Sequence, residues 1–329
     1  MRIIAVVVAL LTLTLPAFAD TLIVCNKYEG TVSFIDLETG KEVARPQTGP
    51  SPHEVALSPD GARAVVVSYL EDGYIGRELN VFDVATAELV QTIPLVDHLA
   101  PHGIKWIGDT ASVLVTTEET RDVIKVNVDE GVVTGSVATD QIGSHLLALS
   151  PDSTTAYVTS RGSDTFSVID VAPMTLVATV DAGVGPEGVD VSPDGAELWV
   201  GNNQSENIMV FDTGTLDQTA VIDVGFLPIR VLFHPDGMVV AVADLRGDRV
   251  VLLDPESHNE IAAVDLAPVK ASAPASLLFS PDGAFLYAGA QDGAMVAEID
   301  TATWQVTRTF EAGAGSDGLA ISPVNVATP

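Results

Sequence analysis

The sequence predicts an all-β protein built as a seven-bladed β-propeller. A five-residue turn phrase returns along the chain, at spacings of 42, 42, 46 and 42 residues from its second copy onward. Short runs rich in Val, Ile, Thr and aromatic residues lie between the copies, separated by Pro, Asp, Gly and Ser, which is typical of strands and hairpins. No stretch of the chain shows a sustained 3.6-residue apolar period. Self-similarity at roughly 40–45 residues with strand patterns between the copies is the signature of a propeller.

The turn phrase first appears as Leu-Ser-Pro-Asp-Gly and then varies mainly in its first two positions. Its copies are Leu57–Gly61, Leu149–Asp152, Val191–Gly195, Phe233–Gly237, Phe279–Gly283 and the shorter Ile321–Pro323. Pro, Asp and Gly each favour tight turns for their own conformational reasons. Each copy therefore predicts the turn between the first and second strands of one blade.

One repeat shows the four expected strands most clearly. They are residues 146–149, 156–159, 166–170 and 176–180. The last repeat ends soon after its first strand, whereas three unassigned strands remain at the other end of the chain, at residues 22–25, 32–36 and 42–44. We therefore predict six continuous blades and a seventh in which these three strands join the C-terminal one. Such pairing closes the ring and removes exposed sheet edges.

The first 19 residues have the pattern of a signal peptide. Arg2 precedes the apolar run 3–15, and Ala17-Phe18-Ala19 forms a small-x-small cleavage site. We expect cleavage between Ala19 and Asp20, a periplasmic or secreted protein without membrane insertion, and one propeller domain over residues 20–329.

Composition limits the classes of partner. The chain has 15 Lys and Arg against 45 Asp and Glu, a formal net charge of −30, and a single Cys. Nucleic-acid binding requires clustered cations, so we expect no nucleic-acid partner. One Cys excludes an internal disulfide framework. We expect a monomer whose partner is a protein or a small molecule.

The residues that open the innermost strands form a ring at one mouth of the central channel. This ring reads His53, His102, His145, Glu187, Ile229, Ala275 and Asp317. Imidazoles and carboxylates that converge at one point suit a divalent transition metal such as copper, zinc or iron. His53, His102, His145 and Glu187 are thus candidate metal ligands. A polar pocket for another ligand, and a polar mouth without any ligand, are the two alternatives.

Other residues are expected near the same rim. Cys25 ends a second strand, Arg230 follows a ring position, and Tyr74 lies in the extended loop 70–78, which is four residues longer than its equivalents. Loops on a rigid scaffold often carry function. With Asp317 they are candidate rim residues, although the Cys also fits a buried apolar role and the Arg also fits compensation of nearby acidity.

Two repeats resemble a known family. Tyr157-Val158-Thr159-Ser160 with residues 165–170, and Leu198-Trp199-Val200-Gly201-Asn202 with residues 207–212, resemble the YVTN repeats of β-propellers. The resemblance covers essentially the whole chain after residue 19. It implies an exported seven-bladed propeller similar to YncE and to surface-layer-associated proteins, and it implies little about activity.

Three functions are compatible with this sequence. The first is binding of a ligand or partner, with or without a metal, through the histidine-bearing face. The second is a metal-assisted lyase, lactonase or hydrolase of the propeller type, in which the ion polarises a carbonyl or activates water. The third is an envelope scaffold that binds other proteins through its loops. No residue set identifies a catalytic centre.

Overall fold

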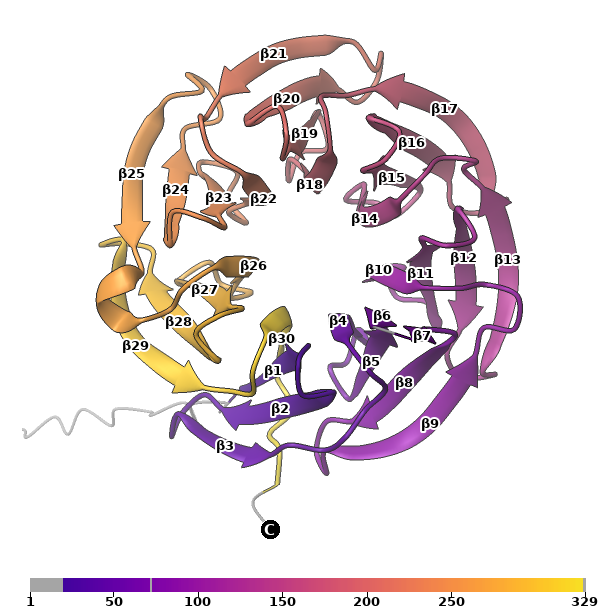
Figure 1. Ribbon diagram of the computed structural model, residues 1–329, viewed down its shortest axis with the longest axis vertical. Helices are drawn as coiled ribbons and strands as arrows, with labels where there is room; N and C mark the ends of the chain where they lie inside the picture. Colours follow the sequence, from indigo (N-terminus) through magenta and orange to yellow (C-terminus); the bar gives the residue numbers. More distant parts are fainter. Residues whose placement is uncertain (1–19, 72, 328–329) are drawn as a thin grey trace, which may run out of the picture.

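Seven four-stranded antiparallel sheets surround a central channel in the computed structural model, which describes residues 20–71 and 73–327 (Figure 1). The predicted all-β, seven-bladed fold is confirmed. The predicted signal peptide, residues 1–19, lies outside the described residues.

Six blades are continuous in sequence, and their strands run in chain order from the channel outward. They are β4 (Pro52–Leu57), β5 (Arg63–Ser68), β8 (Glu78–Asp83) and β9 (Glu88–Pro94); β10 (Pro101–Trp106), β11 (Ser112–Thr117), β12 (Asp122–Asn127) and β13 (Val132–Ala138); β14 (Ser144–Leu149), β15 (Thr155–Ser160), β16 (Thr165–Asp170) and β17 (Thr175–Asp181); β18 (Pro186–Val191), β19 (Glu197–Asn202), β20 (Asn207–Asp212) and β21 (Gln218–Asp223); β22 (Pro228–Phe233), β23 (Val240–Asp244), β24 (Arg249–Leu253) and β25 (Glu260–Asp265); and β26 (Pro274–Phe279), β27 (Phe285–Ala290), β28 (Met295–Asp300) and β29 (Gln305–Glu311).

The seventh blade combines both ends of the described chain. Its strands are β30 (Ser316–Ser322), β1 (Thr21–Asn26), β2 (Thr31–Asp36) and β3 (Lys41–Ala44). β1 pairs with β30 in an antiparallel register that joins Thr21 to Ser322 and Val24 to Leu319. The predicted closure of the ring is therefore confirmed.

Aromatic side chains fill the space between neighbouring blades. Phe166 on β16 packs edge-on against Phe211 on β20, with ring centroids 4.9 Å apart. Phe34 on β2 and Phe82 on β8 meet at the interface between the seventh blade and the first, with ring centroids 6.0 Å apart. All four rings are almost wholly buried. Burying such large apolar groups between sheets supplies the main stabilising contribution of the fold.

The repeated turn phrase has the same hydrogen bonds in several blades. Ser58 Oγ donates to Asp60 Oδ1 at 2.6 Å, and this carboxylate also accepts from the backbone N–H of Ala62. Gly61 has φ of +72°, a conformation that favours glycine. The Ser–Asp bond recurs at Ser150–Asp152, Ser192–Asp194 and Ser280–Asp282. These turns lie at the end of their blades opposite the channel mouth that carries the histidines.

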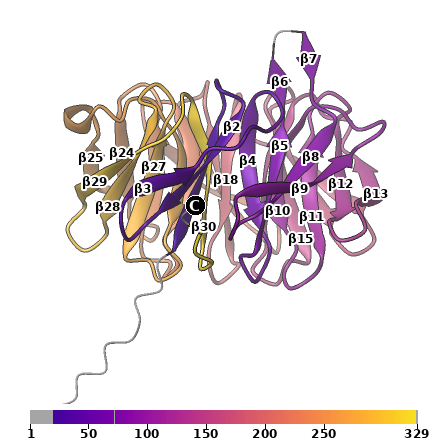
Figure 2. The same ribbon diagram turned by 90° about the horizontal axis from the view of Figure 1, so that it is seen from below.

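Two additions decorate the propeller. A short hairpin of β6 (Leu70–Glu71) and β7 (Tyr74–Ile75) extends beyond the body of the molecule (Figure 2). A single 3-10 turn, η1 (Ala267–Val269), precedes β26. Within residues 20–71 and 73–327, no helical segment has the length and apolar character needed to cross a membrane.

Candidate functional site

The second residue of every innermost strand lines one cavity at the channel mouth, with a volume of about 350 Å³. We call this cavity the mouth pocket and these seven residues the first ring. The first ring is His53, His102, His145, Glu187, Ile229, Ala275 and Asp317. The structure thus places all four predicted metal ligands, together with Asp317, around the same cavity.

A second ring lies beside the first and comes from the residue that follows each second strand. Its members are Lys27, Tyr69, Glu118, Arg161, Asn203, Leu245 and Gln291. Six of them line the mouth pocket, and the seventh, Glu118, contacts the first ring. Sequence reasoning did not place this second ring among the candidate site residues. Its members could have been found from the same repeat, because each is the first residue after the second strand of its blade.

The positions directly after the first ring hold bulky residues in three blades and small residues in four. In chain order they are Glu54, Gly103, Leu146, Gly188, Arg230, Ser276 and Gly318. A Cβ on Gly318 would lie 2.4 Å from the backbone oxygen of His53, and one on Gly103 would lie 2.6 Å from that of His145. Glycine therefore allows neighbouring innermost strands to approach closely at these positions.

The imidazoles of the first ring pack against one another. His102 stacks on His145 with ring centroids 3.6 Å apart and planes inclined by 29°, and the His53 ring lies 4.7 Å from His102. Tyr69 contacts both His53 and His102 edge-on, at 4.7 and 4.6 Å. All three histidines are at most 5% exposed. Three consecutive blades thus form one compact aromatic wall of the pocket.

His145 lies between two carboxylates. Its Nδ1 is 3.2 Å from Oε2 of Glu118, and its Nε2 is 3.1 Å from Oε1 of Glu187. Burial opposes a charge on this imidazole, but the two carboxylates outweigh burial and raise the pKa of His145. Burial likewise opposes ionisation of Glu187, yet His145 and Arg161 lower its pKa to about 2. The three groups form a charged chain across the pocket wall.

The other two ring histidines are neutral. Burial lowers the pKa of His53 and of His102, and the positive charge of His145 adds to the effect. Nδ1 of His53 is 3.0 Å from the backbone oxygen of Ser51, to which its N–H donates. Nδ1 of His102 is buried without a hydrogen-bond partner.

The stacked arrangement does not direct three ligand atoms to a single point. A lone pair on an imidazole nitrogen lies in the plane of the ring, so rings stacked at 3.6 Å direct their lone pairs along nearly parallel planes. Both nitrogens of His145 are already engaged by carboxylates. Within the described ranges, no group of three or more His, Cys, Asp or Glu side chains is arranged to hold a metal ion.

Asp317 lies next to His53 in the first ring, on the neighbouring innermost strand β30, and is 4% exposed. Its Oδ1 lies 3.6 Å from Arg230 Nη2 and its Oδ2 lies 3.9 Å from Lys27 Nζ, both beyond hydrogen-bond distance. Burial raises the pKa of Asp317 to about 7, against the opposing effect of the nearby guanidinium. This carboxyl is therefore poorly compensated by its protein neighbours.

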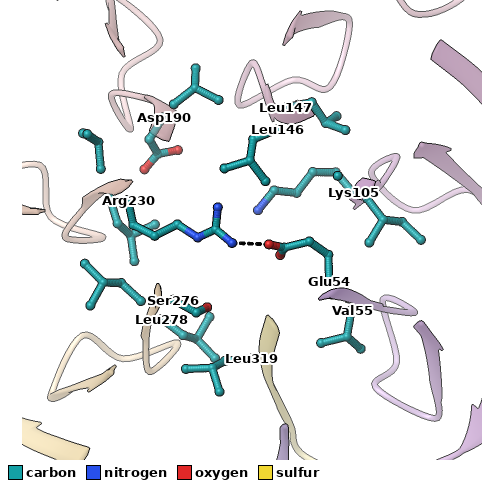
Figure 3. A pocket seen from close by; sticks show the side chains of 16 residues that line it. Glu54, Val55, Lys105, Leu146, Leu147, Asp190, Arg230, Ser276, Leu278 and Leu319 are labelled. Carbon is teal, nitrogen blue, oxygen red and sulfur yellow. Dashed lines mark hydrogen bonds and ion pairs between the residues drawn. The ribbon is translucent and has the colours of Figure 1, made fainter. Parts of the chain in front are cut away.

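Arg230 forms the floor of the mouth pocket. Its side chain reaches across the channel from β22 and pairs with Glu54 on β4 (Figure 3). A smaller cavity of about 110 Å³ lies beyond this pair, where Lys105 and Asp190 also point into the channel. Burial raises the pKa of Asp190 to about 6. The ion pair thus separates two chambers of one channel.

Two of the predicted rim residues do not line the mouth pocket. Cys25 is fully buried in a cluster with Val32 and Phe34, and burial raises the pKa of its thiol well above the usual value. This environment disfavours the reactive thiolate. Tyr74 lies on the projecting hairpin, whereas the earlier Tyr69 reaches the cavity.

Four buried polar atoms around the mouth pocket lack a hydrogen-bond partner. They belong to four of its lining residues: His102 Nδ1, Asn203 Oδ1, Arg230 Nη1 and Asp317 Oδ1. Only three further such atoms occur elsewhere in the described part of the chain. Buried polar groups are normally hydrogen-bonded, so this concentration marks a place where a ligand or water completes the bonding.

Comparison with known proteins identifies the family. The YNCE-like beta-propeller family matches residues 3–218. The chain belongs to the YNCE-like β-propeller family. The family assignment agrees with the YVTN-type repeats, and it extends over the blades that carry His53, His102, His145 and Glu187. No curated protein matches this chain.

Solved structures share the fold of this YNCE-like propeller at low sequence identity. Hydrazine synthase from Kuenenia stuttgartiensis is 21% identical with a TM-score of 0.74, over 86% of this chain and 92% of that one. A "putative 6-phosphogluconolactonase" from Bacteroides uniformis is 17% identical with a TM-score of 0.75, over 92% and 99%. A functionally unknown protein from Desulfotomaculum acetoxidans is 14% identical with a TM-score of 0.76, over 93% and 100%. These similarities describe the fold alone.

Proposed function

We propose that this YNCE-like propeller is a binding protein whose mouth pocket takes a small polar organic ligand. The observation that carries the proposal is the set of four unpartnered buried atoms, all from residues that line one cavity. An unpaired buried polar group typically costs about 1–3 kcal/mol. A ligand that supplies the missing partners would recover this free energy as affinity.

The size and composition of the mouth pocket support this proposal. Its volume of about 350 Å³ lies within the range of roughly 300–1,000 Å³ typical of small-molecule sites. Leu227, Ile229 and Leu245 give it apolar surface beside the charged residues. A pocket with apolar walls and a few buried polar groups is suited to orient one small molecule.

A divalent metal at His53, His102, His145 and Glu187 is the alternative for the same pocket. The neutral imidazoles of His53 and His102 are in the protonation state that a metal requires, and His102 Nδ1 is unpartnered. Binding would nevertheless require the stacked rings to rotate and His145 to leave its carboxylates. The organic ligand needs neither change, so we favour it.

We also propose an exported, monomeric protein in the periplasm or outside the cell. The signal-peptide pattern of residues 1–19 and the net charge of −30 support this proposal. The same charge disfavours nucleic acid as a partner, because no lysine cluster is available to release counterions.

The test is analysis of the protein purified without an affinity tag. Denaturation should release an organic compound at up to one molecule per chain, and the Asn203→Ala variant should release much less. The Asp129→Asn variant, altered at an exposed ion pair with Arg63, is the control and should retain the compound. Stoichiometric copper, zinc or iron that is lost in the His102→Ala variant would support the metal alternative instead. If neither is found, and D-glucose, L-leucine and succinate all fail to raise the unfolding temperature, ligand binding is wrong.

A further inference from the structure

We infer that the mouth pocket binds a zwitterion with an aliphatic side chain, of which an aliphatic α-amino acid is the simplest example. This inference rests on the proposed ligand-binding function and specifies its ligand. It follows from where the pocket places its unpaired donor, its unpaired acceptors and its apolar surface.

The unpartnered groups of the pocket have opposite character. Arg230 Nη1 carries N–H donors and a positive charge, which suit a carboxylate. Asp317 Oδ1 and Asn203 Oδ1 are acceptors, which suit an ammonium group. These three residues are buried or mostly buried, with side-chain exposures of 13% for Arg230 and 5% for Asp317. A ligand with one charge would satisfy only part of this set.

Charges around the cavity are balanced, which also favours a dipolar ligand. Lys27, Arg161, Arg230 and the protonated His145 contribute positive charge. Glu187 and Asp317 contribute negative charge, as do Glu118 and Glu54, which pair with His145, Arg161 and Arg230. A simple cation would meet several cationic side chains in the pocket. A simple anion would be repelled by a molecule with a net charge of −30. A zwitterion is neutral overall and encounters neither penalty in full.

An apolar arc lies between the two acceptor residues, Asn203 and Asp317, and shares its first blade with the donor Arg230. Leu227, Ile229, Leu245 and Ala275 come from the two adjacent blades of β22–β25 and β26–β29. Asn203 lies on the blade before this arc, and Asp317 lies on the blade after it. An aliphatic side chain against this arc would bury apolar surface, which contributes about 0.8 kcal/mol per CH₂ group.

Titration calorimetry with molecules that share one carbon skeleton tests the inference. L-leucine carries both charges, 4-methylpentanoate lacks the ammonium group, and 3-methylbutylamine lacks the carboxylate. We expect L-leucine to bind, with either deletion weakening affinity by about 10- to 100-fold, the cost of leaving a buried charged group unpaired. Glycine, which has both charges and no side chain, should bind more weakly than L-leucine.

The Asp317→Asn variant tests whether Asp317 binds the ammonium group of the ligand. It should lose affinity for L-leucine and 3-methylbutylamine while its affinity for 4-methylpentanoate is unchanged, and Asp129→Asn should behave as the wild type. Equal affinity for L-leucine and 4-methylpentanoate would overturn the inference that the ligand is a zwitterion. If D-glucose binds and L-leucine does not, the inferred ligand class is wrong and the proposed binding function stands. Failure of every probe, with no organic compound released from purified protein, would overturn both.

Discussion

Arg230 and Glu54 lie on innermost strands three blades apart, and their side chains pair across the central channel. The pair divides the channel into the mouth pocket and a smaller chamber that contains Lys105 and Asp190. It also leaves Nη1 of the guanidinium without a hydrogen-bond partner, on a side chain that lines both chambers. One side chain therefore contributes both to the interior of the propeller and to its candidate site.

Removing one member of this pair should destabilise the protein. The Glu54→Gln variant leaves the buried guanidinium without its main counter-charge, and we expect a loss of about 3–5 kcal/mol in the free energy of unfolding. The Glu54→Gln, Arg230→Met double variant should recover most of this loss, because no unpaired charge remains. Urea denaturation measures the free energy of unfolding of both variants. The control is Asp129→Asn, altered at the exposed pair with Arg63, which should cost no more than about 1 kcal/mol. A single variant as stable as the wild type would contradict a buried, closed pair.

The close approach of β30 to β4 should depend on Gly318. An alanine Cβ there would lie 2.4 Å from the backbone oxygen of His53, and backbone atoms cannot move away as a flexible side chain can. We expect Gly318→Ala to destabilise by roughly 1–3 kcal/mol, the range for overpacking. The control is Gly214→Ala, where the nearest atom is an Asp212 side-chain oxygen at 3.4 Å. It should be neutral or slightly stabilising, as expected where the backbone conformation suits alanine.

The blade register was predictable from the sequence because turn residues and strand periods repeat with little variation. The first ring, including His53 and Asp317, followed from this register. The second ring was missed because its members, such as Tyr69 and Glu118, share no residue type and lie beyond the strand ends. Arg230 was expected near the rim. Its side chain enters the channel and pairs with Glu54, which holds the equivalent position in another blade.

Sequence position also could not establish how the ring residues interact. The stacking of His102 on His145 depends on side-chain rotation and on the carboxylates that hold His145 in place. Glu118 comes from a loop of the preceding blade, and no local pattern pairs it with a histidine 27 residues later. In the folded chain the three histidines of this set pack against one another, and within the set His145 is hydrogen-bonded to Glu187.

Ionisation of Asp317 should lower the stability of the fold. The pKa of this carboxyl is raised from 3.8 to about 7, so the folded protein binds the proton more tightly than the unfolded chain does. The stabilising contribution of the protonated form is present at low pH and is lost as pH rises from about 4 to 7. The Asp317→Asn variant, which is neutral at every pH, should match the wild type near pH 4. Near pH 8 it should be more stable by a few kcal/mol, on the order of 3. Urea denaturation at both pH values checks this, and a less stable variant at pH 8 would show that the ionised carboxylate is well compensated.

His145 should remain protonated at a pH where His53 and His102 are neutral. Its two carboxylate partners raise its pKa, while burial lowers that of the other two histidines. Because the folded-state value lies above the ordinary 6.5, the stability from this imidazolium is complete below 6.5 and is lost as pH rises through the raised pKa. Long-range ¹⁵N–¹H NMR spectra would show both ring nitrogens of His145 protonated. The Glu118→Gln variant should lower the pKa of His145, and it should not lower the pKa values of His53 and His102 by as much.

The same NMR measurement also bears on the metal alternative, since a protonated imidazole has no lone pair for an ion. If one equivalent of zinc deprotonates His145 and shifts His102 and His53 together, the metal site is supported over the organic ligand. If the three histidines keep their protonation states in the presence of zinc, the charged chain of Glu118, His145 and Glu187 is structural, and the unpaired atoms around it remain free for an organic ligand.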